Sequence, residues 1–119
     1  FNALKSLESV DLALDKIRIF AEDCESMQGF QVITDSNNAF ASYCSVALEN
    51  IVDEYGKKTI LTFGMEGLEP KHYAEEHTKR FVSNSRAVNM MISTAKLAEF
   101  STLYCPVGNW DQSAKQYHL

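Results

Sequence analysis

The sequence predicts an α/β fold in which parallel strands alternate with helices, and three observations support this. Two short apolar runs, residues 30–34 and 59–63, flank a segment with helical spacing. Parallel strands need a crossover of this kind. Apolar residues also recur every three or four positions in three longer segments. Finally, the 119 residues are 45% hydrophobic and 23% charged, as in soluble globular proteins.

The first predicted helix covers residues 12–26, with Asp11 as its N-cap. Its apolar face is spaced at three or four residues from Val10 to Met27. Gln28 and Gly29 follow, and we expect Gly29 to close the helix in the left-handed conformation.

A strand is predicted at residues 30–34, because the run is β-branched and is bounded by Gly29 and a polar turn. The second helix is predicted from residue 39 to 55, capped by Asn37 or Asn38 and ended by Gly56.

The second strand is predicted at residues 59–63, followed by a loop from Gly64 to Pro70 and an exposed polar segment. The third helix is clearest from residue 84 to 100. A third strand is expected at residues 102–105, stopped by Pro106. Asp111 is expected to cap a last helix.

The loop between the first strand and the second helix lies where many α/β folds hold a phosphate. It consists of Asp35, Ser36, Asn37, Asn38 and Ala39. A phosphate cradle needs glycines for close backbone approach, and this loop has none. Asp35 also places a negative charge where an anion would lie. The loop therefore favours an Asx turn with a helix cap, and we expect no cofactor there.

No other catalytic or metal constellation is evident. His72 and His77 are five residues apart, whereas the zinc motif needs histidines four apart. Three dispersed cysteines indicate reduced thiols, and Cys44 lies on the buried helix face, where packing is its expected role. The net charge of −5 and scattered basic residues argue against nucleic acid, and no run reaches the length of a membrane span.

Residues 22–31, EDCESMQGFQ, resemble the E-x-C-D-x-L-Q-G-F-Q segment of the tubulin superfamily. In tubulins that segment joins a helix to a central strand, and a G-G-G-T-G-S-G loop then wraps the nucleotide phosphates. Residues 53–55, DEY, match the E-Y-P end of the following tubulin helix. The resemblance implies a three-layer tubulin-like or Rossmann-like sheet of parallel strands with flanking helices.

Later segments are similar to a divergent branch, the Misato/DML1 family. These are residues 97–106, LAEFSTLYCP, preceded by Asn89, and residues 110–118, WDQSAKQYH. We therefore expect residues 1–119 to form part of one tubulin-like domain of a longer protein. The chain departs from tubulins at the phosphate loop, which keeps no glycine. It also departs at Arg86, where tubulins place an acidic residue near the nucleotide sugar. No phosphate-binding residue is carried over.

The resemblance implies a non-enzymatic protein that acts in mitochondrial distribution, morphology and inheritance, with links to the spindle. It implies protein partners such as the cytosolic chaperonin or tubulin-related proteins. It also implies a location in the cytoplasm and at the mitochondrial outer surface. The alternative is a GTP-binding protein of the tubulin/FtsZ class with weak GTPase activity.

Overall fold

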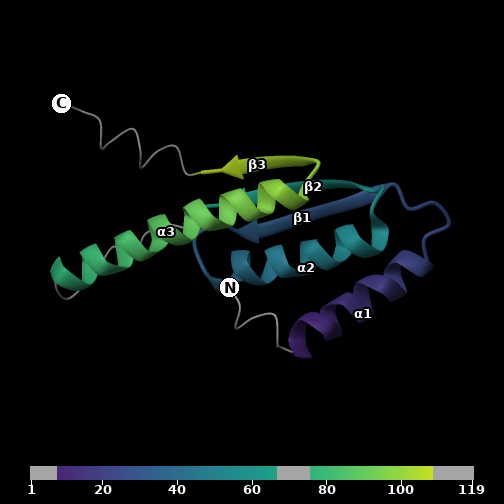
Figure 1. Cartoon of the computed structure of the whole chain (residues 1–119), viewed down its shortest axis with the longest axis horizontal. Coiled ribbons are helices and arrows are strands. Elements are labelled where there is room, and N and C mark those ends of the chain that lie inside the picture. Colours follow the sequence, from purple (N-terminus) through teal and green to yellow (C-terminus); the bar gives the residue numbers. More distant parts are fainter. Residues whose placement is uncertain (1–7, 67–75, 109–119) are drawn as a thin grey trace.

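A computed structural model describes residues 8–66 and 76–108, and the fold is given for these residues. Helices and strands alternate along the chain, as Figure 1 shows. The elements are α1 (Glu8–Glu22), β1 (Gly29–Asp35), α2 (Ala39–Tyr55), β2 (Thr59–Met65), α3 (Glu76–Phe100) and β3 (Leu103–Val107). The predicted α/β class is confirmed.

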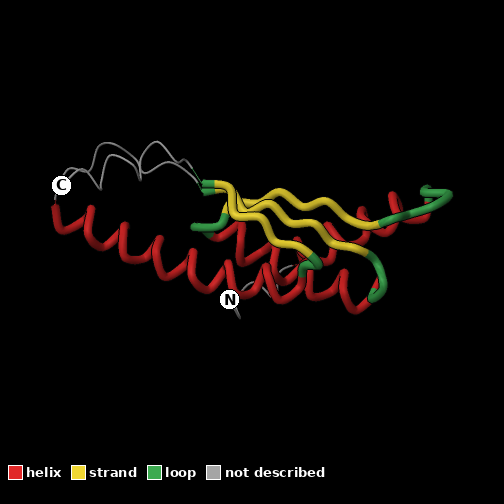
Figure 2. Tube along the Cα trace, turned by 90° about the horizontal axis from the view of Figure 1, so that it is seen from above, coloured by secondary structure: helices red, strands yellow, loops and turns green. Residues whose placement is uncertain are grey.

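The strands form one sheet in the order β1-β2-β3, and both neighbouring pairs are parallel. Phe30 pairs with Ile60, and Thr62 pairs with Tyr104. The predicted strand–helix–strand unit is therefore confirmed, with α2 as the connection between β1 and β2. Figure 2 shows that the helices lie together on one side of the sheet.

The core lies between this side of the sheet and the helices α2 and α3. Its most buried aliphatic side chains come from three elements and are at most 4% exposed: Ala41, Leu48, Ile51, Ile60 and Leu97. A polar pair lies beside them, because the fully buried Thr62 hydroxyl is 2.6 Å from the Ser101 hydroxyl. Buried hydroxyls need such partners.

Helix α1 packs on α2 and is oriented by polar contacts at its surface. The Arg18 guanidinium donates two hydrogen bonds to the Glu54 carboxylate, at 2.7 and 3.2 Å. The Tyr43 hydroxyl donates to the backbone carbonyl of Ser9 at 2.7 Å. Solvent-exposed ion pairs contribute little to stability, so the pair mainly fixes how α1 lies on α2.

The opposite face of the sheet carries apolar side chains that the described helices do not cover. Ile33, Phe63 and Cys105 form one row across it, and Met65 and Val107 belong to the next. Ile33 is 74% exposed. Parallel sheets are normally covered on both faces. The described residues thus contain two layers, and the third layer of the predicted arrangement stays a prediction.

The first helix and Gly29 differ from the sequence prediction. Helix α1 starts at Glu8, so Asp11 lies inside it, and it ends at Glu22 rather than at residue 26. Gly29 is the first residue of β1, and no described glycine has a positive φ. The left-handed cap is therefore wrong. A Cβ at Gly29 would overlap the Thr59 carbonyl oxygen, so close strand approach is what this position requires.

Two later elements, α3 and β2, are longer than the sequence predicted. Helix α3 begins at Glu76 rather than at residue 84, and the added first turns contain the good helix formers Glu76, Lys79 and Arg80. Strand β2 continues through Gly64, where Tyr104 from β3 lies across the glycine.

Pro106 lies within β3 instead of ending it. Proline is tolerated there because β3 is an edge strand of the described sheet. The predicted helix at Asp111 and residues 71–75 lie outside the described residues. Within residues 8–66 and 76–108, no helix has both the length and the apolar character needed to cross a membrane.

Candidate functional site

The connection between β1 and α2 brings the five predicted loop residues together at the carboxyl edge of the sheet. Asn38 has an extended backbone, with φ of −139° and ψ of −172°, and it directly precedes α2. Its side-chain oxygen accepts a hydrogen bond from the Phe40 backbone N–H at 2.9 Å. Asn38 is thus the N-cap, which confirms one of the two asparagines predicted for this role.

The other end of the Asn38 amide is also engaged. Its nitrogen donates to the Asp35 carboxylate at 2.7 Å. One side chain therefore closes the turn from both directions, capping the helix and bonding to the last residue of β1. An anion at this helix end would have to displace the cap and would meet the negative charge of Asp35.

Ser36 fixes the same loop to the end of β2. Its backbone N–H and its hydroxyl both donate to the Met65 carbonyl, at 2.8 and 3.0 Å. Ser36 and Asn37 are buried, with 4% and 6% of their surfaces exposed. Two of the five predicted loop residues therefore face the interior, and only Ala39 is exposed. This arrangement is that of a self-capped turn.

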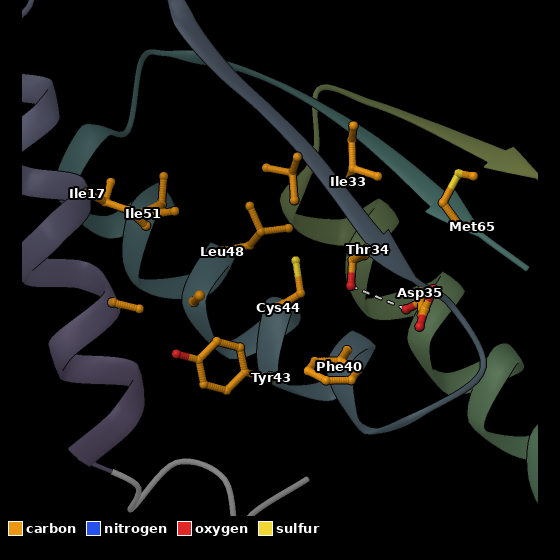
Figure 3. A pocket seen from close by; sticks show the side chains of 13 residues that line it. Ile17, Ile33, Thr34, Asp35, Phe40, Tyr43, Cys44, Leu48, Ile51 and Met65 are labelled. Carbon is orange, nitrogen blue, oxygen red and sulfur yellow. Dashed lines mark hydrogen bonds between the residues drawn. The ribbon is translucent and has the colours of Figure 1, made fainter. Parts of the chain in front are cut away.

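An apolar groove of about 480 Å³ adjoins the loop, between α1, α2 and β1. Figure 3 shows Phe40 and Tyr43 of α2 on its lower side and Asp35, the last residue of β1, at one end. Among the described residues that line the groove, Asp35 is the one with a carboxylate. The sequence did not predict this groove, because its walls form only when α1, β1 and α2 pack against one another.

The Cys44 thiol lines the groove and is half-buried. Burial raises the pKa of this thiol, and a hydrogen bond with Thr34 offsets part of the rise. A raised pKa keeps the group in the neutral form, which is a poor nucleophile. The geometry therefore supports the predicted packing role of Cys44.

Other residues singled out from the sequence lie away from this loop. Arg86 and His77 are on α3, Arg86 half-buried and His77 exposed. Among the described residues, no group of three or more potential metal ligands comes together. His72 lies outside them, so the predicted absence of a histidine metal motif stays a prediction.

The sheet is parallel, and its first loop lies where nucleotide-binding domains hold phosphate. The protein therefore has the α/β architecture of that class of domains. The family model described as "Tubulin domain" matches residues 1–119, and the chain belongs to this family.

Within the family, the chain is similar to curated DML1 and misato proteins. It is 32% identical over 112 residues to protein DML1 of Phaeosphaeria nodorum, covering 91% of this chain and 20% of that protein. It is 30% identical over 93 residues to protein misato homolog 1 of Danio rerio, covering 78% of this chain and 15% of that protein. The chain thus spans a fifth or less of the length of these relatives.

Replacing the cap residue tests the loop geometry. We expect Asn38→Ala to lower the free energy of unfolding by about 1 kcal/mol, because the Phe40 N–H loses its acceptor. Asn38→Ser should recover most of this loss, since serine also caps helices well. Urea unfolding of the full-length protein measures both effects. Equal losses for the two variants would contradict capping by this side chain.

Proposed function

We propose that this protein is a non-enzymatic member of the tubulin domain family that acts through protein–protein contacts in mitochondrial distribution, morphology and inheritance. The observation that carries the non-enzymatic part is the loop closed by Asn38 and Asp35. The similarity to DML1 and misato proteins supports the assignment to that branch. The mitochondrial role, the chaperonin or tubulin-related partners and the outer-surface location rest on the resemblance to that branch.

Nucleotide binding at the loop is disfavoured by both charge and hydrogen bonding. The helix N-terminus attracts anions through free N–H groups. Here the Phe40 N–H is already bonded to Asn38, and the Asp35 carboxylate lies at the same edge. A phosphate would repel that carboxylate, and no glycine lets the backbone approach it more closely.

Titration of the full-length protein with fluorescent GTP and Mg²⁺ tests this part of the proposal. We expect no saturable binding up to millimolar GTP. Saturable binding in the micromolar range would contradict the proposal and favour a GTP-binding protein of the tubulin/FtsZ class.

Ala39→Asp provides a matched variant for this titration. Ala39 is exposed at the first position of α2, where an added acidic group is compatible with the helix dipole. The variant should fold normally while repelling any phosphate. If GTP does bind, loss of binding in Ala39→Asp locates it at this loop.

The cellular part is tested in cells that lack the protein, by imaging the mitochondrial network. Wild type and Ala39→Asp should restore its distribution equally, because the proposed role needs no anion at the loop. If the stably expressed Ala39→Asp variant does not restore the mitochondrial distribution, the loop binds an anion that the function requires. Failure of the wild type to affect mitochondria would overturn the mitochondrial role.

A further inference from the structure

Helix α1 carries apolar residues on its outer side as well as on the side that packs on α2. Leu12, Ile19 and Phe20 are 61%, 58% and 72% exposed. Leu12 and Ile19 are seven residues apart, which is close to two turns, so they lie on the same face of the helix. Phe20 follows Ile19 directly and widens this face. Exposed apolar residues that gather on one face, unlike single ones, are typical of an interaction site.

A row of carboxylates runs beside these apolar residues. Asp11, Asp15 and Glu22 are exposed and follow steps of four and seven residues, which places them on one side of α1. Around the helix axis this row lies about 70° from the line of Leu12 and Ile19. The six residues are defined here as the outer face of α1: Asp11, Leu12, Asp15, Ile19, Phe20 and Glu22.

The negative charge of this part of the chain is not balanced locally. Residues 8–25 contain six acidic and two basic residues, whereas α3 contains two acidic and four basic residues. Arg18, one of the two basic residues, is already paired with Asp15 and Glu54. A segment that docks on the outer face is therefore favoured by positive charge. An anionic membrane surface or a nucleic acid would be repelled.

The place of α1 in the fold leaves its outer face open. Figure 1 shows α2 between α1 and the sheet, and α2 is the main packing partner of α1. The exposure of Leu12, Ile19 and Phe20 shows that none of the described elements covers the outer face.

We propose that the outer face of α1 binds a basic amphipathic helix of a separate partner protein. Leu12 and Ile19 repeat at seven residues, and so do Asp15 and Glu22. Where one helix pairs with another, apolar residues at this spacing pack together and the flanking charges select the partner. The complementary helix thus carries an apolar side flanked by lysine or arginine. This inference rests on the protein-contact part of the proposed function, and not on its nucleotide or mitochondrial parts.

Titration of the full-length protein with a fluorescent helical peptide tests the proposal. The probe is a synthetic helix of about 20 residues, with leucine on one side and lysine on the flanks. A matched peptide carries glutamate in place of every lysine. We expect saturable binding of the lysine peptide, weaker at high salt because of screening, and no binding of the glutamate peptide. Failure of the lysine peptide to bind would overturn the proposal, while the GTP titration and the mitochondrial imaging would be unaffected.

Three variants locate the binding. Glu22→Lys reverses a charge on the outer face, and Glu99→Lys makes the same change at an exposed position of α3. Glutamate and lysine have similar helix propensities, so both variants should fold. Ile19→Gln removes an exposed apolar side chain of the outer face. We expect Glu22→Lys and Ile19→Gln each to weaken binding of the lysine peptide at least about tenfold, and Glu99→Lys less than about twofold. Equal weakening by the two lysine variants would indicate general charge attraction and overturn the proposal.

The remaining outcomes concern other occupants of the outer face. A maleimide should label Ile19→Cys about as fast as Lys57→Cys, which is exposed after α2. Labelling of Ile19→Cys at least about tenfold more slowly would assign the face to the same polypeptide and overturn the proposal. A wild-type dimer in light scattering that Ile19→Gln dissociates would assign it to a second copy, with the same consequence. Binding to phosphatidylcholine vesicles that Ile19→Gln abolishes would assign it to a lipid surface and overturn the proposal as well.

Discussion

Replacing Leu97 with alanine is expected to lower the free energy of unfolding by about 2–5 kcal/mol. Leu97 is completely buried and lies in the cluster that contains Leu48 and Ile60. Truncation removes apolar contacts and leaves a cavity that the surrounding α2 and β2 side chains fill only in part. The contacts that are lost are those that attach α3 to α2 and to the sheet. Urea unfolding of the full-length protein, followed at the first transition, measures it.

Leu97→Met is the matched control for this experiment. Methionine has nearly the same volume and should cost less than about 1.5 kcal/mol. A large difference between the two variants assigns the effect to the cavity rather than to any change at position 97. If Leu97→Ala unfolds like the wild type, α3 is not docked through this side chain.

The second helix could be predicted from the sequence because its limits are set locally. Asn38 supplies a cap within two residues of the first helical N–H, and Gly56 follows the last helical residue. Both signals act over a single turn of chain, so they do not depend on the rest of the fold. The prediction of residues 39–55 is accordingly confirmed at both ends.

Boundaries set by tertiary contacts could not be predicted in this way. The sequence predicts a loop at Gly64, but Gly64 lies in β2. There Tyr104 packs across it from a strand 40 residues later in the chain. Pro106 is predicted to end the third strand, but it lies within β3 at the edge of the described sheet. Helix α3 has apolar residues on both its sides, which blurs the periodicity that marks a helix with one buried face.

The residue types of the candidate site indicated its local structure, but its hydrogen bonds to other elements could not be predicted from the sequence. The lack of glycine and the presence of Asp35 and Asn38 indicated a capped turn from the sequence alone. The bonds from Ser36 to the Met65 carbonyl required the position of β2, which the loop sequence does not contain. The groove beside the loop required α1 as well, since Ile17 and Ala13 form part of its wall.

Replacing Gly29 is expected to be costly for a reason that depends on the neighbouring strand. A Cβ at this position would overlap the Thr59 carbonyl oxygen and lie 3.1 Å from the carbonyl carbon. These atoms are backbone, so β1 and β2 must move apart to make room. We expect Gly29→Ala to lower the free energy of unfolding by about 1–3 kcal/mol, as for other overpacked positions, with Gly29→Val at the upper end.

Gly29→Asn distinguishes this explanation from a left-handed helix cap. Asparagine tolerates positive φ and replaces glycine in such caps, so a cap would make it milder than alanine. Steric overlap with Thr59 makes asparagine at least as costly as alanine, because both carry the same Cβ. Gly108→Ala is the control, since its Cβ would meet only the end of the flexible Glu66 side chain and should cost little. Urea unfolding of the four variants therefore measures how closely β1 and β2 approach at the segment through which the chain resembles tubulins.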